Sequence, residues 1–129
     1  MDKSTDLIIV GGSLNGCALA LAAAGAGLSV TLIDAEDVAT QTLSNFNGRS
    51  YAVALASQRL LNGIGLWDDL EDDAQPMLEI KVTDGRVGEG PSPFFMHFDH
   101  AEIEEGPMGF MVEDRHLRRA FLNAVQNAK

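Results

Sequence analysis

The first 34 residues alternate between apolar runs and small residues in a pattern that predicts a strand, a helix and a second strand. An apolar run over residues 7–10 leads into a glycine-rich turn, and an Ala- and Leu-rich segment begins near Leu14. A second apolar run covers residues 29–33 and ends at Asp34. Uninterrupted apolar runs of this length are typical of strands that a parallel sheet buries on both faces. We therefore expect a βαβ unit over residues 1–34.

The next 40 or so residues, 35–74, are expected to form a loop and a helix. The segment up to Gly48 is small and polar, which favours a long loop. Apolar side chains then recur at mostly helical spacing over residues 55–64, and nearby glycines give stop signals. Trp67 and Leu70 are expected to pack a short turn after this helix.

Residues 75–112 contain the patterns of antiparallel strands. Residues 78–83 alternate strictly and predict a half-buried strand, and residues 84–93 have the composition of turns. Residues 94–100 predict another strand, in which the Phe94–Phe98 stripe is more typical of a core than of a stacking platform. A short strand follows near residues 110–112.

The last segment, residues 113–129, predicts a helix from Glu113 to about Asn127 that turns Leu117, Phe121, Ala124 and Val125 inward. A plain NAD dehydrogenase domain would instead continue from Asp34 into another helix and a third parallel strand. The order of elements therefore favours an α/β fold. Its Rossmann-like FAD-binding βαβ unit is of the glutathione-reductase type, with added antiparallel strands and a C-terminal helix.

The turn between the first strand and the helix carries the chemistry of a nucleotide site. Gly11 allows a tight exit from the strand, and Gly16 lets the helix pack closely on the sheet. The helix N-terminus offers free N–H groups to a pyrophosphate. Asp34 lies 18 residues after Gly16, where a carboxylate accepts hydrogen bonds from a ribose. It would repel a ribose 2′-phosphate, which favours FAD or NAD over NADP.

Ser13 stands where the motif has its middle glycine. That glycine normally lets the backbone approach the phosphate without a Cβ in the way. The Ser13 hydroxyl either donates to a phosphate oxygen or is merely a tolerated small side chain, and the sequence leaves both interpretations open.

Composition and charge narrow the class of protein. A chain of 129 residues is about one domain, and a net charge of −10 argues against a nucleic-acid partner. A single cysteine suits a reducing cytoplasm. The chain has no basic leader and no uninterrupted apolar span, so we expect a cytoplasmic location. Peripheral contact with the inner membrane remains compatible with this sequence.

The remaining reactive side chains favour no metal and no nucleophile. Cys17 is expected to be a buried packing residue, because no histidine or second cysteine accompanies it. His97 and His100 are three residues apart on a predicted strand, so they would point to opposite faces. His116 has no partner at ligand spacing. We predict no metal site and leave the catalytic residues open.

Four segments carry a resemblance to a known family: IIVGGSLNG, GRSYAVALASQRLLNGIGLW, LEIKVTDG and GFMVEDRHLRRAF. In this order and spacing the chain resembles the class A flavoprotein aromatic hydroxylases, most closely their ubiquinone-biosynthesis branch. The resemblance implies an enzyme that binds FAD, takes electrons from NAD(P)H, and adds one oxygen atom of O2 to a polyprenylated phenol. It is also compatible with peripheral contact with a membrane or with a biosynthetic complex.

The resemblance also implies which residues bind the cofactor. Arg49 matches an arginine that reaches the flavin, although a surface arginine after a glycine turn is the alternative. Glu113 and Arg118 match a helix start near the cofactor, although both also complement a helix dipole. The full set of candidate cofactor-binding residues is Gly11, Gly12, Ser13, Leu14, Asn15, Gly16, Asp34, Ala35, Arg49, Glu113 and Arg118.

Members of this family are much longer and have a second flavin motif, built around a Gly-Asp pair, far downstream. We therefore expect residues 1–129 to be the N-terminal part of an FAD-binding domain, inactive as a hydroxylase when alone. Two other hypotheses stay open. One is a different FAD- or NAD-dependent oxidoreductase on the same scaffold, and the other is a non-catalytic nucleotide-binding module.

Overall fold

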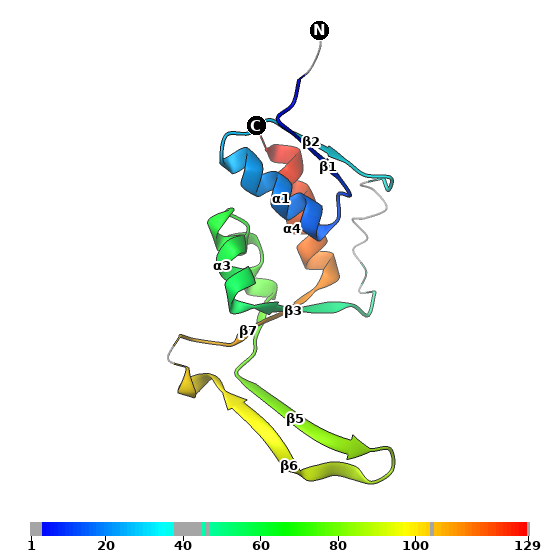
Figure 1. Cartoon of the computed structure of the whole chain (residues 1–129), viewed down its shortest axis with the longest axis vertical. Helices are drawn as coiled ribbons and strands as arrows, with labels where there is room; N and C mark the ends of the chain where they lie inside the picture. Colours follow the sequence, from blue (N-terminus) through cyan, green and yellow to red (C-terminus); the bar gives the residue numbers. More distant parts are fainter. Residues whose placement is uncertain (1–3, 38–44, 46, 104, 129) are drawn as a thin grey trace.

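The computed structural model describes residues 4–37, 45, 47–103 and 105–128. Its first unit contains strand β1 (Leu7–Val10), helix α1 (Leu14–Gly25) and strand β2 (Val30–Ile33). The two strands pair in parallel, with Leu7 opposite Val30, and α1 lies against them (Figure 1). The predicted βαβ unit is therefore confirmed, because both apolar runs lie in one sheet.

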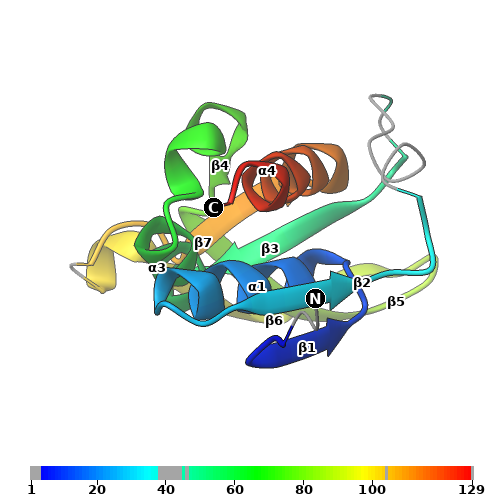
Figure 2. The ribbon, with the colours of Figure 1, turned by 90° about the horizontal axis from the view of Figure 1, so that it is seen from above.

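Helix α1 lies between the β1–β2 pair and helix α4 (Asp114–Asn127), as Figure 2 shows. Helix α1 is rich in alanine and glycine, and small side chains let helices approach closely. Cys17 is buried at this contact together with Leu117 and Phe121 of α4. The C-terminal helix is as expected, although it begins at Asp114, one residue later than predicted.

A three-stranded antiparallel sheet forms the middle of the molecule, in the order β3-β7-β4. Its strands are β3 (Ser50–Ala54), β7 (Gly109–Glu113) and β4 (Gln75–Pro76). The expectation of only a loop and a helix over residues 35–74 was wrong at β3. Full pairing with β7 makes this segment a strand, and helix α3 (Leu55–Gly63) starts only afterwards.

Two short 3-10 helices, η1 (Trp67–Asp69) and η2 (Glu71–Asp73), close the core beneath this sheet. Leu66 and Leu70 are completely buried, and the Trp67 ring lies 4.7 Å from that of Phe110, measured between centroids. Aromatic pairs at this separation add to the stabilisation from buried area. The predicted packing of Trp67 and Leu70 is therefore confirmed.

Strands β5 (Glu79–Arg86) and β6 (Gly90–Asp99) form a hairpin that projects from the rest of the molecule (Figure 1). The hairpin is longer than expected, because strand pairing extends through most of residues 84–93. His100 lies outside β6, in the 3-10 helix η3 (His100–Glu102), so the expectation that it would be on the strand was wrong.

The predicted burial of this hairpin was also wrong. β5 is exposed along its whole length, and Phe94 of the expected core stripe is 85% exposed. Within the described part of the chain the two strands pair only with each other, and nearly all of their residues are exposed, so no layer covers either face. The alternating pattern correctly predicted the strands, but such a pattern does not show whether another layer of the fold covers them.

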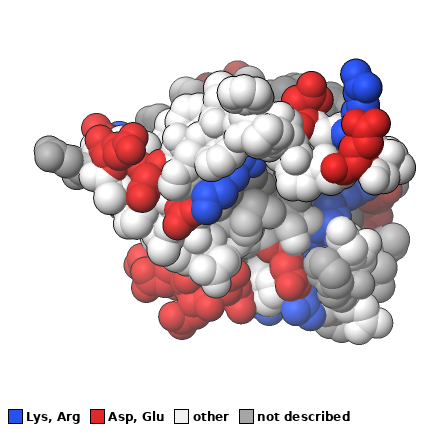
Figure 3. Space-filling view, turned by 90° about the horizontal axis from the view of Figure 1, so that it is seen from below, with Lys and Arg blue, Asp and Glu red and all other residues white. Residues whose placement is uncertain are grey.

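The surface carries the negative charge expected from composition. In Figure 3, which views the molecule from the hairpin end, acidic side chains gather in patches, and uncharged residues occupy much of the surface between them. No helix in the described ranges is long and apolar enough to cross a membrane.

Candidate functional site

The glycine turn lies at the carboxyl ends of β1 and β2, where open parallel sheets bind ligands. Gly11 has a φ of +106°, a conformation that side chains other than glycine rarely adopt, and its N–H donates to Ile33 O at 2.7 Å. A Cβ built on Gly16 would overlap the carbonyl oxygen of Gly11. Both glycines are therefore required for the turn to come so close to the helix.

The N-terminus of α1 opens from this turn. Ser13 is the N-cap residue and is exposed, and its hydroxyl makes no capping hydrogen bond. Leu14 and Asn15 begin the helix, and its first turn contains no acidic side chain. The first N–H groups of a helix have no partner within the helix, so this end can bind an anion. The Ser13 hydroxyl lies beside these donors.

Asp34 directly follows β2 and joins it to the glycine turn. Its Oδ2 accepts a hydrogen bond from Gly12 N, and its Oδ1 accepts one from Glu36 N at 2.7 Å. These backbone bonds, first that from Glu36 and then that from Gly12, hold the pKa of Asp34 below its ordinary value. Asp34 and the adjacent Ala35 are exposed, and an ionised carboxylate has lone pairs beyond these bonds with which to accept a ribose hydroxyl.

Arg118 of α4 also lies at this turn. Together with Gly12, Ser13 and other residues it lines a small hollow beside the glycine turn. Its Nε donates to Asp114 Oδ2 at 2.8 Å, and this bond raises the pKa of Arg118. A positive charge beside a helix N-terminus adds to its attraction for phosphate. The structure therefore brings Arg118 to the motif.

Arg49 lies in the turn before β3 and is exposed. Its N–H donates to Asn47 Oδ1 at 3.0 Å, and its carbonyl accepts from Asp114 N at 3.0 Å. Asn47 Nδ2 in turn donates to Asp114 Oδ2 at 2.9 Å. The backbone of Arg49 is thus tied to the start of α4, the helix that carries Arg118.

Glu113 is the N-cap of α4, but its carboxylate binds elsewhere. It accepts a hydrogen bond from Arg115 Nε at 2.6 Å and lies 3.6 Å from His116 Nε2. It is not among the residues that line the hollow at the motif. The structure therefore brings Arg118, and not the Glu113 side chain, to the glycine turn.

Sequence reasoning missed Asp114, the acidic residue that connects these parts. Asp114 is four residues before Arg118, a spacing that places both side chains on one face of a helix. That spacing was a usable signal. It was not singled out, because an Asp at a helix start is ordinarily an exposed complement to the dipole.

Cys17 is a packing residue, as expected. It is buried, and its Sγ donates to Gly12 O at 3.0 Å. Burial, and secondarily the charge of Asp34, raise the pKa of the thiol, so the thiolate is disfavoured. Among the described residues, no group of three or more His, Cys, Asp and Glu side chains is placed to hold a metal ion.

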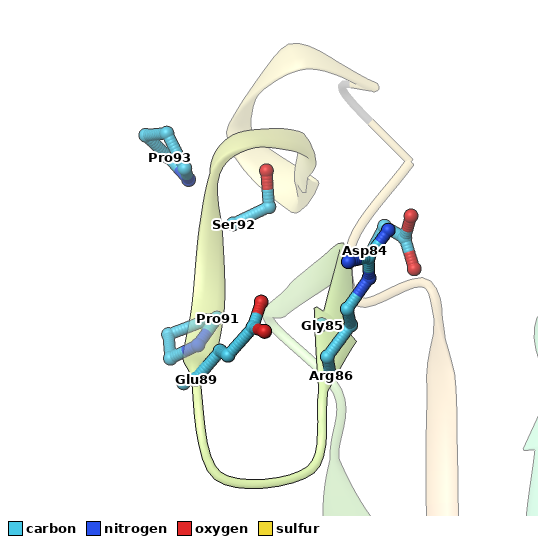
Figure 4. Close-up of a pocket in the computed structure, with 8 residues that line it drawn as sticks. Asp84, Gly85, Arg86, Glu89, Pro91, Ser92 and Pro93 are labelled. Carbon is cyan, nitrogen blue, oxygen red and sulfur yellow. The ribbon is translucent and has the colours of Figure 1, made fainter.

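A pocket of about 310 Å³ lies at the tip of the hairpin, between Asp84 and Arg86 on β5 and Pro91 and Pro93 on β6 (Figure 4). Both walls belong to one exposed hairpin, which projects away from the α1 and α4 helices at the glycine turn (Figure 1). This pocket therefore adds nothing to the candidate site.

The residues at the motif fit the ADP part of a dinucleotide. The glycines would let the backbone approach a pyrophosphate, helix N–H groups and Arg118 would supply donors, and Asp34 would supply acceptors for a ribose. A family model described as FAD dependent oxidoreductase matches residues 6–84, which include this motif. The match identifies FAD as the dinucleotide and confirms the α/β fold predicted from the sequence.

A curated relative extends the similarity over nearly the whole chain. The chain is 50% identical over 124 residues to the ubiquinone hydroxylase UbiL of Rhodospirillum rubrum. The match covers 96% of this chain and 28% of that protein, so the chain spans less than a third of its relative's length. The predicted likeness to the ubiquinone-biosynthesis hydroxylases is thereby confirmed.

Two solved structures share the fold at low sequence identity. The p-nitrophenol 4-monooxygenase PnpA from Pseudomonas putida DLL-E4 superposes with a TM-score of 0.72 and 17% identity, over 99% of this chain and 31% of that one. HpxO of Klebsiella pneumoniae, complexed with FAD and uric acid, gives a TM-score of 0.65 and 20% identity, over 92% of this chain and 28% of that one.

Proposed function

Because the chain belongs to the FAD dependent oxidoreductase family, we propose that it forms the FAD-binding part of a monooxygenase that hydroxylates a polyprenylated phenol in ubiquinone biosynthesis. The observation that carries this proposal is the joint placement of the glycine turn, Asp34 and Arg118 around one helix N-terminus. The 50% identity to a ubiquinone hydroxylase supports the choice of substrate class.

The residues of this chain bind and orient the cofactor. We assign the pyrophosphate to the N–H groups at the start of α1, with Ser13 and Arg118 as further donors. Asp34 accepts the hydroxyls of the adenosine ribose, and Arg49 reaches toward the flavin from the turn before β3. When bound, FAD takes up electrons and activates O2 for transfer of one oxygen atom to the ring.

NAD(P)H is the proposed electron donor, and the phenol and O2 are the proposed substrates. A polyprenyl chain partitions into lipid, so we also propose peripheral contact with a membrane. The β5–β6 hairpin supports this, because its exposed apolar side chains, among them Ile80, Val82, Met96 and Phe98, offer contacts for a lipid-like molecule.

Oxygen-isotope incorporation tests the proposed reaction. The protein expressed from its complete reading frame is supplied with FAD, NADH or NADPH, a polyprenylated phenol and isotopically labelled O2. We expect one labelled oxygen atom in the product. NAD(P)H oxidation that yields only hydrogen peroxide with every phenol offered, or reduction of the isoprenoid chain, would contradict the proposal. Residues 1–129 alone serve as a control that we expect to form no product.

A further inference from the structure

Asp114 is the one buried charged residue among the described residues, and it lies where three parts of the site meet. It is 1% exposed and is the first residue of α4, directly after β7. Its Oδ2 accepts hydrogen bonds from Arg118 Nε and Asn47 Nδ2. Its Oδ1 is buried and has no hydrogen-bond partner among the described residues. A buried carboxylate is costly, so such a group requires its partners.

The partners of Asp114 are the segments that carry the cofactor-binding arginines. Asn47 uses its Oδ1 to accept the N–H of Arg49, and Asp114 N donates to the Arg49 carbonyl. The Arg49 turn is therefore held on two sides, by the backbone of Asp114 and through Asn47. On the helix side, Asp114 fixes the guanidinium of Arg118 through its Nε.

The way Arg118 is held leaves its phosphate-binding capacity intact. The bond to Asp114 occupies Nε, and the two terminal amino groups make no hydrogen bond within the described part of the chain. Arg118 lines the same small hollow as Gly12 and Ser13, which places it within reach of the motif. A fixed guanidinium loses less side-chain entropy when a ligand binds.

We propose that Asp114 is a positioning residue of the cofactor site, which orients Arg118 and the Arg49 turn toward the FAD pyrophosphate and flavin. The proposal rests on the proposed function, because it requires FAD at the glycine turn. For the removal of the Asp114 charge, the proposal predicts the opposite change in FAD affinity from the one that electrostatic repulsion alone predicts. Removing a negative charge beside a doubly negative pyrophosphate should tighten binding, whereas loss of orientation should weaken it.

The test measures FAD dissociation constants by flavin fluorescence on apoprotein made from the complete reading frame. Asp114→Asn keeps the volume of the side chain and removes its charge. We expect it to weaken FAD binding about tenfold, the loss that follows from one misaligned charge-assisted hydrogen bond. The control is Arg119→Ala on the same helix. Arg119 is 55% exposed and pairs with Asp73 at 3.0 Å, so this variant should bind FAD normally.

A double-mutant cycle separates positioning from a role in folding. Asp114→Asn keeps the backbone N–H that holds the Arg49 carbonyl and an amide oxygen for Asn47, so its effect on FAD affinity should run through Arg118. That effect should fall below threefold once Arg118→Ala is present. Tighter or unchanged binding in the single variant, or an equal loss in both backgrounds, would overturn the proposal.

A second variant covers the case in which Asp114→Asn does not fold. Asn47 is exposed, and Asn47→Ala removes its bond to Asp114 and its bond to the N–H of Arg49, which together link Asp114 to the Arg49 turn. We expect this variant to weaken FAD binding about threefold with an unchanged unfolding midpoint. Normal FAD affinity in that variant would overturn the proposal. Wild-type protein that binds no FAD overturns the proposed function as well, whereas wild-type binding with unaffected variants overturns only the role of Asp114.

Discussion

Gly16 offers a sharp test of the glycine turn, because the same helix provides a matched control. A Cβ on Gly16 would overlap the carbonyl oxygen of Gly11, a backbone atom that cannot move without displacing the turn. A Cβ on Gly25, at the other end of α1, meets no atom within 4 Å. Gly16→Ala and Gly25→Ala are therefore the same chemical change in crowded and open surroundings.

The two substitutions are expected to change the free energy of unfolding in opposite directions. Replacing glycine by alanine in a helix stabilises the helix by about 0.5–1 kcal/mol, because alanine loses less conformational freedom on folding than glycine does. Overpacking costs roughly 1–3 kcal/mol where a neighbour must shift. We expect Gly25→Ala to raise the free energy of unfolding by up to about 1 kcal/mol. Gly16→Ala should lower it by about 1–2 kcal/mol.

Cofactor affinity should separate the two variants further. A shifted turn misaligns the N–H groups that face the pyrophosphate, and charge-assisted hydrogen bonds contribute about 1.5–3 kcal/mol each. Gly16→Ala should therefore weaken FAD binding roughly 10- to 100-fold, and Gly25→Ala should leave it unchanged. Urea unfolding and flavin-fluorescence titration measure the two quantities. A Gly16→Ala protein as stable as Gly25→Ala, with wild-type FAD affinity, would refute the close approach at this turn.

Three further predictions concern single side chains. Asp34→Ala should weaken FAD retention and keep the fold, which gel filtration with flavin quantification would measure; unchanged retention would place the ribose elsewhere. Cys17 should react with thiol reagents only as the protein unfolds, because burial raises its pKa, and rapid labelling of the native protein would contradict this. Asp114 has a lowered pKa despite the opposing effect of burial, since Arg118 and Asn47 donate to it. Its contribution to stability should be present above its ordinary pKa of 3.8 and lost as the pH falls below it, so Asp114→Asn should flatten the acid limb of a stability–pH profile.

The sequence was sufficient for the parts of the fold in which local pattern and tertiary contact agree. The glycine turn, α1, β2 and α4 each carry a periodicity or a turn signal that their packing then uses. β3 was missed because its apolar pattern continues into that of α3 without a break. Its strand conformation is determined by pairing with β7, which is distant in the sequence. β4 has two residues, one of them Pro76, which is too short for any periodicity.

Candidate site residues were predictable where a motif fixed them. Gly11, Gly16 and Asp34 lie at one strand edge because the βαβ unit places them there. For Asp114 the sequence offered only its spacing to Arg118, because its other side-chain partner, Asn47, lies 67 residues earlier in the chain. Contacts of that kind come from the folded chain and leave no local pattern.

The central claim is that the glycine turn of this chain holds FAD. The most direct measurement is to purify the protein expressed from its complete reading frame, record its visible absorption spectrum, and identify the released nucleotide by mass spectrometry. The account predicts the absorption bands of oxidised flavin, with FAD released in a stoichiometry near one, and loss of both in Asp34→Ala. A colourless protein that takes up no FAD, or one that binds NAD at this turn instead, would contradict it.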